Sequence, residues 1–533
     1  MAGLRLFAGV FAVSVSAQPV VLTAQYDNSR TGANTRETVL KPRLVNPSGF
    51  GKLFVLPVDG DVYAQPLYVP KLEIPGKGLH NVVFVATEHD SVYAFDATGE
   101  PSAPLWQVSF LDPKSGITTV PEGAVHCPFI TPEVGITPTP VIDPETRTMY
   151  VLARTREKDR FYQRLHALDI ATGAEKPGSP VVIRASFKTS ALFGLSDREV
   201  TFHALLENPR AALLLANRTV YITWASSCDV GPYFGWVLAY DARTLKQTGV
   251  FNTSPDSGES GIWQADAGIA ADNAGNVFAV TGNGKFTASS GGRDYGDTVL
   301  KLSLKDGALT VRDFFTPYNQ QALNANDDDL GSSGPVLLPD QPGPHPHLLV
   351  TAGKAGVIYL IDRDNMGKYH PGSDAHAVQT LRGAGTSDFG APAYWNGHLY
   401  YFGSEDVLKD FKVDGGRLSS TAVHAGTYKF KDPGAIPSIS ADGARDGIVW
   451  IVTTKGWQDP DRNAILQAYD AADVSRMLYT SDYSAHDGLG LALRFAMPTI
   501  ADGRVYVGVK RGVYVYGLLG KKQAAMTSTT SRH

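Results

Sequence analysis

The sequence predicts an all-β protein, namely an eight-bladed β-propeller of four-stranded antiparallel blades. Two patterns carry this prediction: a pair of β-rich runs that recurs eight times, and a proline that recurs just before a third run. The composition agrees, because 54 Gly and 33 Pro in 533 residues favour many turns over long helices. With 43% apolar and only 19% charged residues, the chain is expected to fold around a large core.

In each repeat, β-branched and aromatic residues form two short runs around a turn, and the second run commonly ends in an acidic residue before another turn. The first repeat shows this pattern clearly, with Val82–Val85 followed by Val92–Asp96. The other pairs begin at Met149, Val220, Val277, Leu348, Leu399, Val449 and Val505. Units of about 60 residues that recur in this way are typical of a β-propeller.

A third run precedes most of the repeats, and it contains a proline. These prolines are Pro66, Pro140, Pro335, Pro392, Pro437 and Pro498. Proline has no N–H to donate to a sheet, so it belongs on an edge strand. The innermost strand of a propeller blade, which lines the central channel, is such an edge. We therefore expect each proline to lie on, or at the start of, an innermost strand.

The two ends of the propeller sequence are predicted to meet in one blade. The eighth repeat ends near Gly517, which leaves no room for an outer strand of its own. The β-rich run Lys52–Leu56 can supply that strand, and this pairing would close the ring without an exposed sheet edge.

The first residues are typical of a secretory signal. Arg5 precedes the apolar stretch Leu6–Val15, which ends in the small-residue pattern Val15-Ser16-Ala17. We therefore expect the protein to be secreted or periplasmic, and no other stretch reaches the ~20 apolar residues of a membrane helix. The predicted organisation is a signal peptide at 1–17, an N-terminal extension at 18–47, the propeller at 48–518 and a disordered polar tail at 519–533.

The charge balance bears on the expected binding partners, and the cysteine content bears on a possible disulfide. Lys and Arg number 48 against 53 Asp and Glu, with no basic run, so a nucleic-acid partner is not expected. Cys127 and Cys228 could pair in an oxidising compartment, which the sequence alone leaves open. Cys127 lies in Pro113–Thr131, a long insertion of the kind that is often either a functional lid or disordered.

The strand ends resemble those of a known repeat. Ala239-Tyr240-Asp241-Ala242 and Leu168-Asp169 resemble the pyrroloquinoline quinone (PQQ) repeat of the quinoprotein alcohol dehydrogenase-like propellers, and the resemblance covers about residues 48–518. The tryptophan-docking element of that repeat is found only once, from Asp96 to Trp106, so the chain looks like a divergent member. The same repeat also builds propellers without enzymatic activity, and fold alone does not fix function.

The resemblance implies PQQ in the channel above a Ca²⁺ ion, which oxygen ligands from three successive blades would hold. Asp229 resembles the acidic ligand, and Asn283, in the turn Thr281-Gly282-Asn283-Gly284, resembles the asparagine ligand. The acidic run Asn326–Leu330 resembles the segment that holds the catalytic aspartate. Asp327 and Asp329 both remain candidates for the base, and Asp327 is also a candidate metal ligand.

Two further residues resemble cofactor contacts of this family. Lys354 resembles the basic residue that contacts the quinone carbonyl, and Trp263 stands roughly where the family places a ring beneath the cofactor. Many alcohol-oxidising members carry two adjacent cysteines that form a disulfide against the cofactor, whereas this chain has His126-Cys127 near that position.

The resemblance implies a mechanism for an alcohol or sugar-like substrate. Ca²⁺ would polarise the quinone C5 carbonyl as a Lewis acid, and the aspartate would take the alcohol proton while a hydride passes to the quinone. Lys354 would stabilise the developing oxyanion. The chain has no Cys-x-x-Cys-His haem motif, so electrons would leave to an external acceptor.

Two other functions stay open from the sequence. Asp and Asn commonly bend or cap turns, and each of the candidate ligands lies in a turn. The chain could therefore be a non-catalytic propeller that binds a protein or polymer partner on its faces. A hydrolase or lyase that uses channel carboxylates without a cofactor is the third hypothesis.

Overall fold

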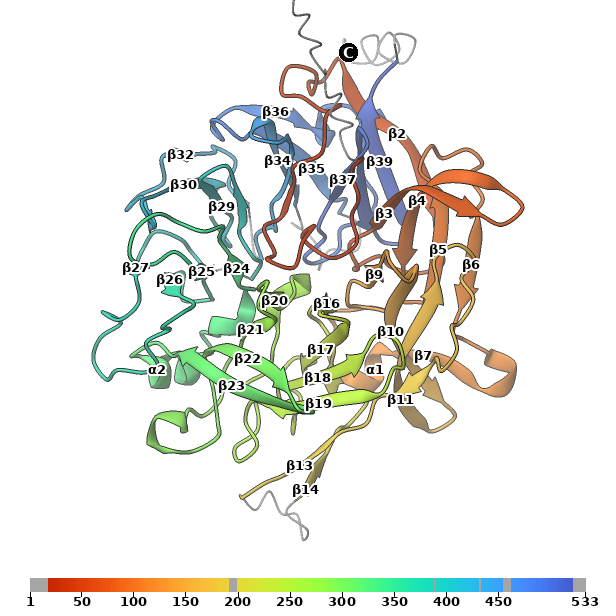
Figure 1. Cartoon of the computed structure of the whole chain (residues 1–533). Helices are drawn as coiled ribbons and strands as arrows, with labels where there is room; N and C mark the ends of the chain where they lie inside the picture. Colours follow the sequence, from red (N-terminus) through yellow and green to blue (C-terminus); the bar gives the residue numbers. More distant parts are fainter. Residues whose placement is uncertain (1–17, 191–198, 388, 431–432, 454–461, 521–533) are drawn as a thin grey trace, which may run out of the picture.

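The computed structural model describes residues 18–190, 199–387, 389–430, 433–453 and 462–520. The predicted signal peptide and nearly all of the predicted tail lie outside the described residues. Within them, eight mainly antiparallel blades form a ring (Figure 1). The prediction of an eight-bladed β-propeller is therefore confirmed.

The first half of the ring follows the chain in order. Blade 1 contains β3 (Leu67–Ile74), β4 (Gly78–Ala86), β5 (Ser91–Asp96) and β6 (Trp106–Ser109). Blade 2 contains β9 (Val141–Asp143), β10 (Thr148–Glu157), β11 (Arg160–Asp169) and β12 (Val181–Val182). Blade 3 contains β16 (Leu214–Ala216), β17 (Thr219–Ser226), β18 (Trp236–Asp241) and β19 (Gln247–Asn252). Blade 4 contains β20 (Ala270–Ala271), β21 (Asn276–Val280), β22 (Val299–Lys305) and β23 (Ala308–Phe315).

The second half repeats this order and ends on the closing strand. Blade 5 contains β24 (Val336–Leu337), β25 (Leu348–Thr351), β26 (Ile358–Asp362) and β27 (Gln379–Leu381). Blade 6 contains β28 (Ala393–Trp395), β29 (His398–Tyr401) and β30 (Lys409–Asp414), with β31 (Arg417–Leu418) and β32 (His424–Ala425) both paired to β30. Blade 7 contains β33 (Ser438–Asp442), β34 (Arg445–Thr453), β35 (Ile465–Asp470) and β36 (Met477–Thr480). Blade 8 contains β37 (Thr499–Ala501), β38 (Arg504–Val509), β39 (Gly512–Leu518) and β2 (Phe50–Pro57).

Two sequence predictions about the strands are confirmed. The N-terminal strand β2 pairs with β39, and Phe54 lies opposite Val515, so the first and last parts of the propeller share one blade. Each of the six recurring prolines immediately precedes an innermost strand, as Pro66 precedes β3 and Pro498 precedes β37. The missing N–H of proline thus falls where the sheet has an edge.

The blades pack against one another through apolar and aromatic side chains. Between blades 7 and 8, the ring centroid of Phe50 lies 5.3 Å from that of Trp450 and 4.9 Å from that of Tyr479, and all three side chains are buried. Aromatic contacts of this kind add about 1 kcal/mol each to the burial of apolar area. The core is therefore a series of layers between neighbouring blades.

Helices and additional short strands connect the blades. The described residues contain the α-helices α1 (Glu122–Val125) and α2 (Gln320–Asn326), and the 3₁₀ turns η1 (Pro113–Ser115), η2 (Gln264–Asp266), η3 (Ala288–Ser290), η4 (Leu330–Ser332), η5 (Ser481–Tyr483) and η6 (Ala485–Asp487). The remaining strands are β1 (Ala33–Asn34), β7 (Ile117–Pro121), β8 (Glu133–Val134), β13 (Ser186–Lys188), β14 (Glu199–Thr201) and β15 (Glu207–Asn208). None of the described helices is long and apolar enough to cross a membrane.

The N-terminal extension passes into the middle of the ring, as the red trace in Figure 1 shows. Its backbone carbonyls accept N–H groups from the second residue of the innermost strand in six blades; these donors are Tyr68, Ile142, Ala271, Leu337, Tyr394 and Ile439. The side chain of Asn28 donates to Leu215 O in blade 3, and the hydroxyl of Tyr26 accepts the N–H of Ile500 in blade 8. Residues 21–32 therefore satisfy inner-edge backbone groups of all eight blades.

Candidate functional site

Three loops at the same end of neighbouring blades carry residues that the sequence marked as candidates. Asp229 lies between β17 and β18 of blade 3, Asn283 between β21 and β22 of blade 4, and Lys354 between β25 and β26 of blade 5. Each loop joins the second strand of its blade to the third. Because the blades repeat around the ring, equivalent loops emerge side by side on one face of the propeller.

The turn that carries Asn283 is held by the acidic segment that follows α2. The backbone N–H of Asn283 donates to Asp329 Oδ1 at 2.7 Å, and its side-chain amide donates to Asp327 Oδ1 at 2.5 Å. Glycine is required at position 282, since a Cβ there would lie 2.1 Å from Asp329 Oδ1 and 2.8 Å from the ring of Trp263. The Gly-Asn turn thus lets the backbone approach the carboxylate closely.

Lys354 joins the two aspartates. Its Nζ lies 2.6 Å from Asp329 Oδ2 and 3.0 Å from Asp327 Oδ2. Burial alone would lower the pKa of Lys354, but the two carboxylates outweigh this effect and raise it. The side chain of Asp329 is only 7% exposed and lines a pocket, to which Asp229 and Lys354 also belong. The side chain of Asp327 is 66% exposed. The structure therefore distinguishes Asp329 from Asp327 by burial, whereas the sequence left the two equivalent.

Asp229, from the loop between β17 and β18, lines the same pocket as Asp329. Its Oδ1 accepts a hydrogen bond from the hydroxyl of Tyr233 at 2.9 Å. Burial raises the pKa of Asp229, and the charges of Asp327 and Lys354 act on it as well. No direct hydrogen bond or ion pair links Asp229 to Asn283 or Lys354, all of which are described residues. The structure thus brings Asn283, Asp327, Asp329 and Lys354 into contact and places Asp229 nearby.

The donor atoms suit a hard cation. Asn283 Oδ1 is buried and, among the atoms that the structure describes, has no hydrogen-bond partner. A buried amide oxygen without a donor calls for an explanation, and a bound cation is one. Across the described ranges, no three His, Cys, Asp or Glu side chains stand together in an arrangement that could hold a metal ion. An ion at this place would therefore need the neutral oxygen of Asn283 beside the carboxylates.

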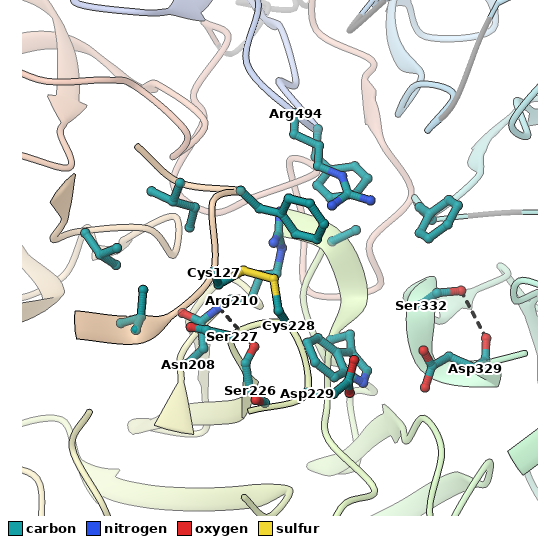
Figure 2. A pocket seen from close by; sticks show the side chains of 18 of the residues that line it. Cys127, Asn208, Arg210, Ser226, Ser227, Cys228, Asp229, Asp329, Ser332 and Arg494 are labelled. Atoms are coloured by element: carbon teal, nitrogen blue, oxygen red, sulfur yellow. Dashed lines mark hydrogen bonds between the residues drawn. A yellow bond between two sulfur atoms is a disulfide. The ribbon is translucent and has the colours of Figure 1, made fainter. Parts of the chain in front are cut away.

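Figure 2 shows the pocket that Asp229 and Asp329 line. Asp229 lies at its lower end, the Cys127–Cys228 disulfide lies on one side, and Asp329 lies across the cavity. The ring of Trp263 also lines the pocket and stands edge-on to Tyr233, with ring centroids 5.9 Å apart. Its buried Nε1 has no hydrogen-bond partner among the described atoms.

The two cysteines form a disulfide, with their Cα atoms 5.5 Å apart. The pairing that the sequence left open is therefore made in the structure. It connects the insertion between blades 1 and 2 to the loop of blade 3 that carries Asp229, and both cysteines line the pocket. A disulfide thus borders the pocket although the chain lacks two adjacent cysteines.

Sequence reasoning missed two cationic residues of the pocket, Arg210 and Arg494. The guanidinium group of Arg494 lies 4.5 Å from the ring centroid of Phe129 and 4.8 Å from that of Phe495. The guanidinium group of Arg210 lies 4.6 Å from the ring of Phe495. Neither arginine belongs to a motif, so nothing in the sequence marked them. They place two guanidinium groups against aromatic rings in the wall of the pocket.

Known structures share this architecture at low sequence identity. No protein-family model and no curated protein matches the chain. The quinohemoprotein alcohol dehydrogenase of Comamonas testosteroni matches with a TM-score of 0.59 and 15% identity over 95% of this chain and 81% of that chain. The quinohemoprotein alcohol dehydrogenase ADHIIG of Pseudomonas putida HK5 gives 0.59 and 15% over 94% and 80%. A europium-containing methanol dehydrogenase gives 0.59 and 13% over 94% and 98%.

These neighbours bear out the resemblance that the repeats suggested, at the level of the fold. At such identities the comparison identifies the architecture and leaves activity to the residues of the pocket. The chain therefore has the same eight-bladed fold as these quinoprotein alcohol dehydrogenases.

Proposed function

We propose that the protein is a dehydrogenase that oxidises an alcohol or sugar-like substrate with PQQ and Ca²⁺ held in this pocket. One observation supports the proposal above all others. Asp229 and Lys354, from blades 3 and 5, line a pocket that also has an indole ring and a disulfide in its walls, and Asn283 of blade 4 contacts the lining residue Asp329. The candidate ligands are Asp229, Asn283 and one aspartate of the pair Asp327 and Asp329.

The chemistry of the pocket suits PQQ, which is a flat tricyclic quinone with several carboxylates. Trp263 offers a flat apolar surface of matching shape. Arg210 and Arg494 place guanidinium groups in the pocket wall, and guanidinium–carboxylate pairs bind more strongly than neutral hydrogen bonds. When bound, PQQ would supply an acceptor for two electrons and Ca²⁺ would supply Lewis acidity.

The residues of the chain would then have distinct roles. We assign the general base to Asp329, because it lines the pocket while Asp327 lies on its exposed edge. Burial raises the pKa of Asp329, and Lys354 together with the N–H of Asn283 opposes that rise. Lys354 thereby favours the carboxylate form, which is the form that can take the proton of a substrate hydroxyl.

The proposal extends to partners and location. Electrons would leave to an external acceptor, since the chain carries no haem-attachment motif. Secretion or a periplasmic location rests on residues 1–17, which lie outside the described residues. A disulfide at the pocket agrees with an oxidising compartment.

Terbium luminescence tests the cation site without activity. Tb³⁺ is a hard cation, and a nearby tryptophan sensitises its emission. We expect Tb³⁺ emission on excitation of the tryptophans, with Trp263 as the donor because it lines the pocket, and Ca²⁺ should suppress this emission by competition. Asn283→Ala should weaken Tb³⁺ binding roughly tenfold or more, with Asn276→Ala as the matched control, because Asn276 bonds to Asp272 in the same blade away from the pocket.

Cofactor uptake tests the rest of the proposal. The protein incubated with PQQ and millimolar Ca²⁺ should gain quinone absorbance and dye-linked alcohol oxidation, and Asn283→Ala should lose both. If the wild-type protein takes up no PQQ, the pocket is not a quinone site. The non-catalytic propeller that binds a protein or polymer would then be the better assignment.

A further inference from the structure

We propose that the Cys127–Cys228 disulfide is a positioning element, which holds the Asp229 carboxylate at the cation end of the pocket. The consequence is that cation binding requires the oxidised pair. This inference rests on the proposed function, because it concerns the cation site described there. It adds a role for two residues that lie outside the ligand set.

The first argument is the conformation of the turn. Cys228 and Asp229 both have left-handed backbones, with φ of 51° and 55°. Each such residue other than glycine costs roughly 1–2 kcal/mol, so the turn needs partners that hold it. Ser226 Oγ donates to Val230 O at 3.0 Å, and Tyr233 donates to Asp229 itself. The disulfide is the covalent member of this set, and it acts on the residue next to the carboxylate.

The second argument is that Cys127, the other half of the disulfide, lies in a well-anchored segment. Cys127 lies in the insertion formed by β7, α1 and β8, which is fixed to blade 2 because β7 pairs with β10, with Thr119 opposite Thr155. Cys127 packs with Val120, Val125, Ile130 and Val134 in an apolar cluster that also includes Tyr63 and Leu493. The disulfide therefore ties the Asp229 turn to an anchored, buried unit.

The third argument is the place of the bond. Both cysteines line the pocket that contains Asp229 and Asp329, so a small reductant can reach the sulfurs from the pocket. A dithiol would supply two electrons and two protons: the S–S bond breaks, two S–H groups form, and the dithiol becomes a disulfide. The Asp229 turn would then keep its strain and lose its covalent support. The carboxylate would no longer be fixed near Asn283.

The test combines Tb³⁺ affinity with hydrogen exchange on the folded, full-length protein. Reduction should weaken Tb³⁺ binding about tenfold and speed amide exchange in residues 113–131 and 226–231, with little change in the strands of blades 5 to 7. The variant with both Cys127→Ser and Cys228→Ser should behave like the reduced protein. Because the chain has only two cysteines, a dithiol should not alter that variant further.

A double-mutant cycle ties the effect to Asp229. In Asp229→Asn, reduction should change Tb³⁺ affinity little, because the group that the disulfide positions is already lost. A disulfide that only stabilises the fold would weaken binding equally in both backgrounds. Should the double serine variant fail to fold, chemical reduction of the native protein still provides the comparison.

The outcomes separate this inference from the proposed function. If oxidised and reduced protein bind Tb³⁺ equally, the positioning role is wrong and the cation site stands. Faster amide exchange on reduction without a change in Tb³⁺ affinity likewise overturns the positioning role, since the Asp229 turn would then move without affecting the bound ion. If even the oxidised protein binds no Tb³⁺, the proposed cation site fails and this inference fails with it.

Discussion

The ammonium group of Lys354 lies 2.6 Å from the carboxylate of Asp329, and the same ammonium lies 3.0 Å from the carboxylate of Asp327. One cation thus compensates two anions, of which Asp329 is buried and Asp327 is exposed. Removal of one partner from a buried ion pair is costly because it leaves an uncompensated charge. The relationship between these residues therefore bears on stability as well as on chemistry.

Lys354→Met should destabilise the protein at neutral pH. The substitution keeps most of the side-chain volume but leaves Asp329 buried beside Asp327 without a compensating charge. We expect the free energy of unfolding to fall by about 3 kcal/mol, measured by chemical denaturation. Lys409→Met is the matched control, since Lys409 lies 2.6 Å from Asp406 with similar exposure but neutralises a single carboxylate. An equal loss in both variants would contradict the role of the second aspartate.

Gly282→Ala should disrupt the site while the propeller remains folded. Its Cβ would lie 2.1 Å from Asp329 Oδ1, so the carboxylate must move away from the N–H of Asn283. We expect weaker Tb³⁺ binding, by roughly tenfold, with little change in the circular dichroism spectrum. Gly123→Ala is the control, because nothing lies within 4 Å of a Cβ at that position. Unchanged Tb³⁺ affinity in Gly282→Ala would speak against the turn as part of the site.

Asp61 should make the protein less stable as the pH rises. Burial raises the pKa of this carboxyl from its ordinary 3.8 to about 6. The folded state therefore binds more protons than the unfolded state between about pH 4 and 6, so stability is highest below this window and falls as the pH rises through it.

Asp61→Asn removes that titration. We compare the free energy of unfolding of the variant with that of the wild type at pH 4 and at pH 7.5. Between these two pH values, the difference should shift in favour of the variant by up to about 3 kcal/mol. Unfolding curves at the two pH values measure this shift. Asp159→Asn serves as the control, because the side chain of Asp159 is fully exposed. A variant that tracks the wild type at both pH values would show that Asp61 keeps an ordinary pKa.

The fold was predictable because its determinants are local. Strands such as β5 and β18 are mostly apolar runs that contain Val and two aromatic residues each and are bounded by turns, and the sequence repeats this unit around the ring. The prolines predicted where the innermost strands begin, because a residue without an N–H belongs at a sheet edge in any blade. The path of residues 21–32 was not predictable, because it depends largely on backbone carbonyls, which every residue has, and its side-chain contacts from Tyr26, Asn28 and Arg30 follow no repeating pattern.

The site was predictable only in part. Asn283 and the segment of Asp327 and Asp329 stood out because a Gly-Asn turn and an acidic run are local patterns. Their mutual contacts, and the difference in exposure between Asp327 and Asp329, depend on how α2 ends and how two blades meet. Arg210 and Arg494 enter the pocket from distant parts of the chain, and no spacing rule connects them.

Arg30 shows how strongly the N-terminal extension is built into the ring. Its side chain is fully buried, and its guanidinium group donates to Ile269 O at 2.9 Å in blade 4 and to Leu213 O at 3.2 Å in blade 3. It also donates to Thr23 Oγ1 and Ala24 O within its own segment. One side chain thus connects the extension to two blades.

Arg30→Ala should therefore be among the most destabilising single substitutions in the chain. It leaves several buried acceptors without donors and a cavity at the axis, for which we expect a loss of about 4 kcal/mol in the free energy of unfolding. Arg30→Lys should recover only a small part, because an ammonium group cannot reproduce the planar fork. Arg36→Ala, at an exposed position of the same extension, should change stability by no more than about 0.5 kcal/mol. Equal stabilities of Arg30→Ala and Arg36→Ala in urea would mean that the extension contributes little to the ring.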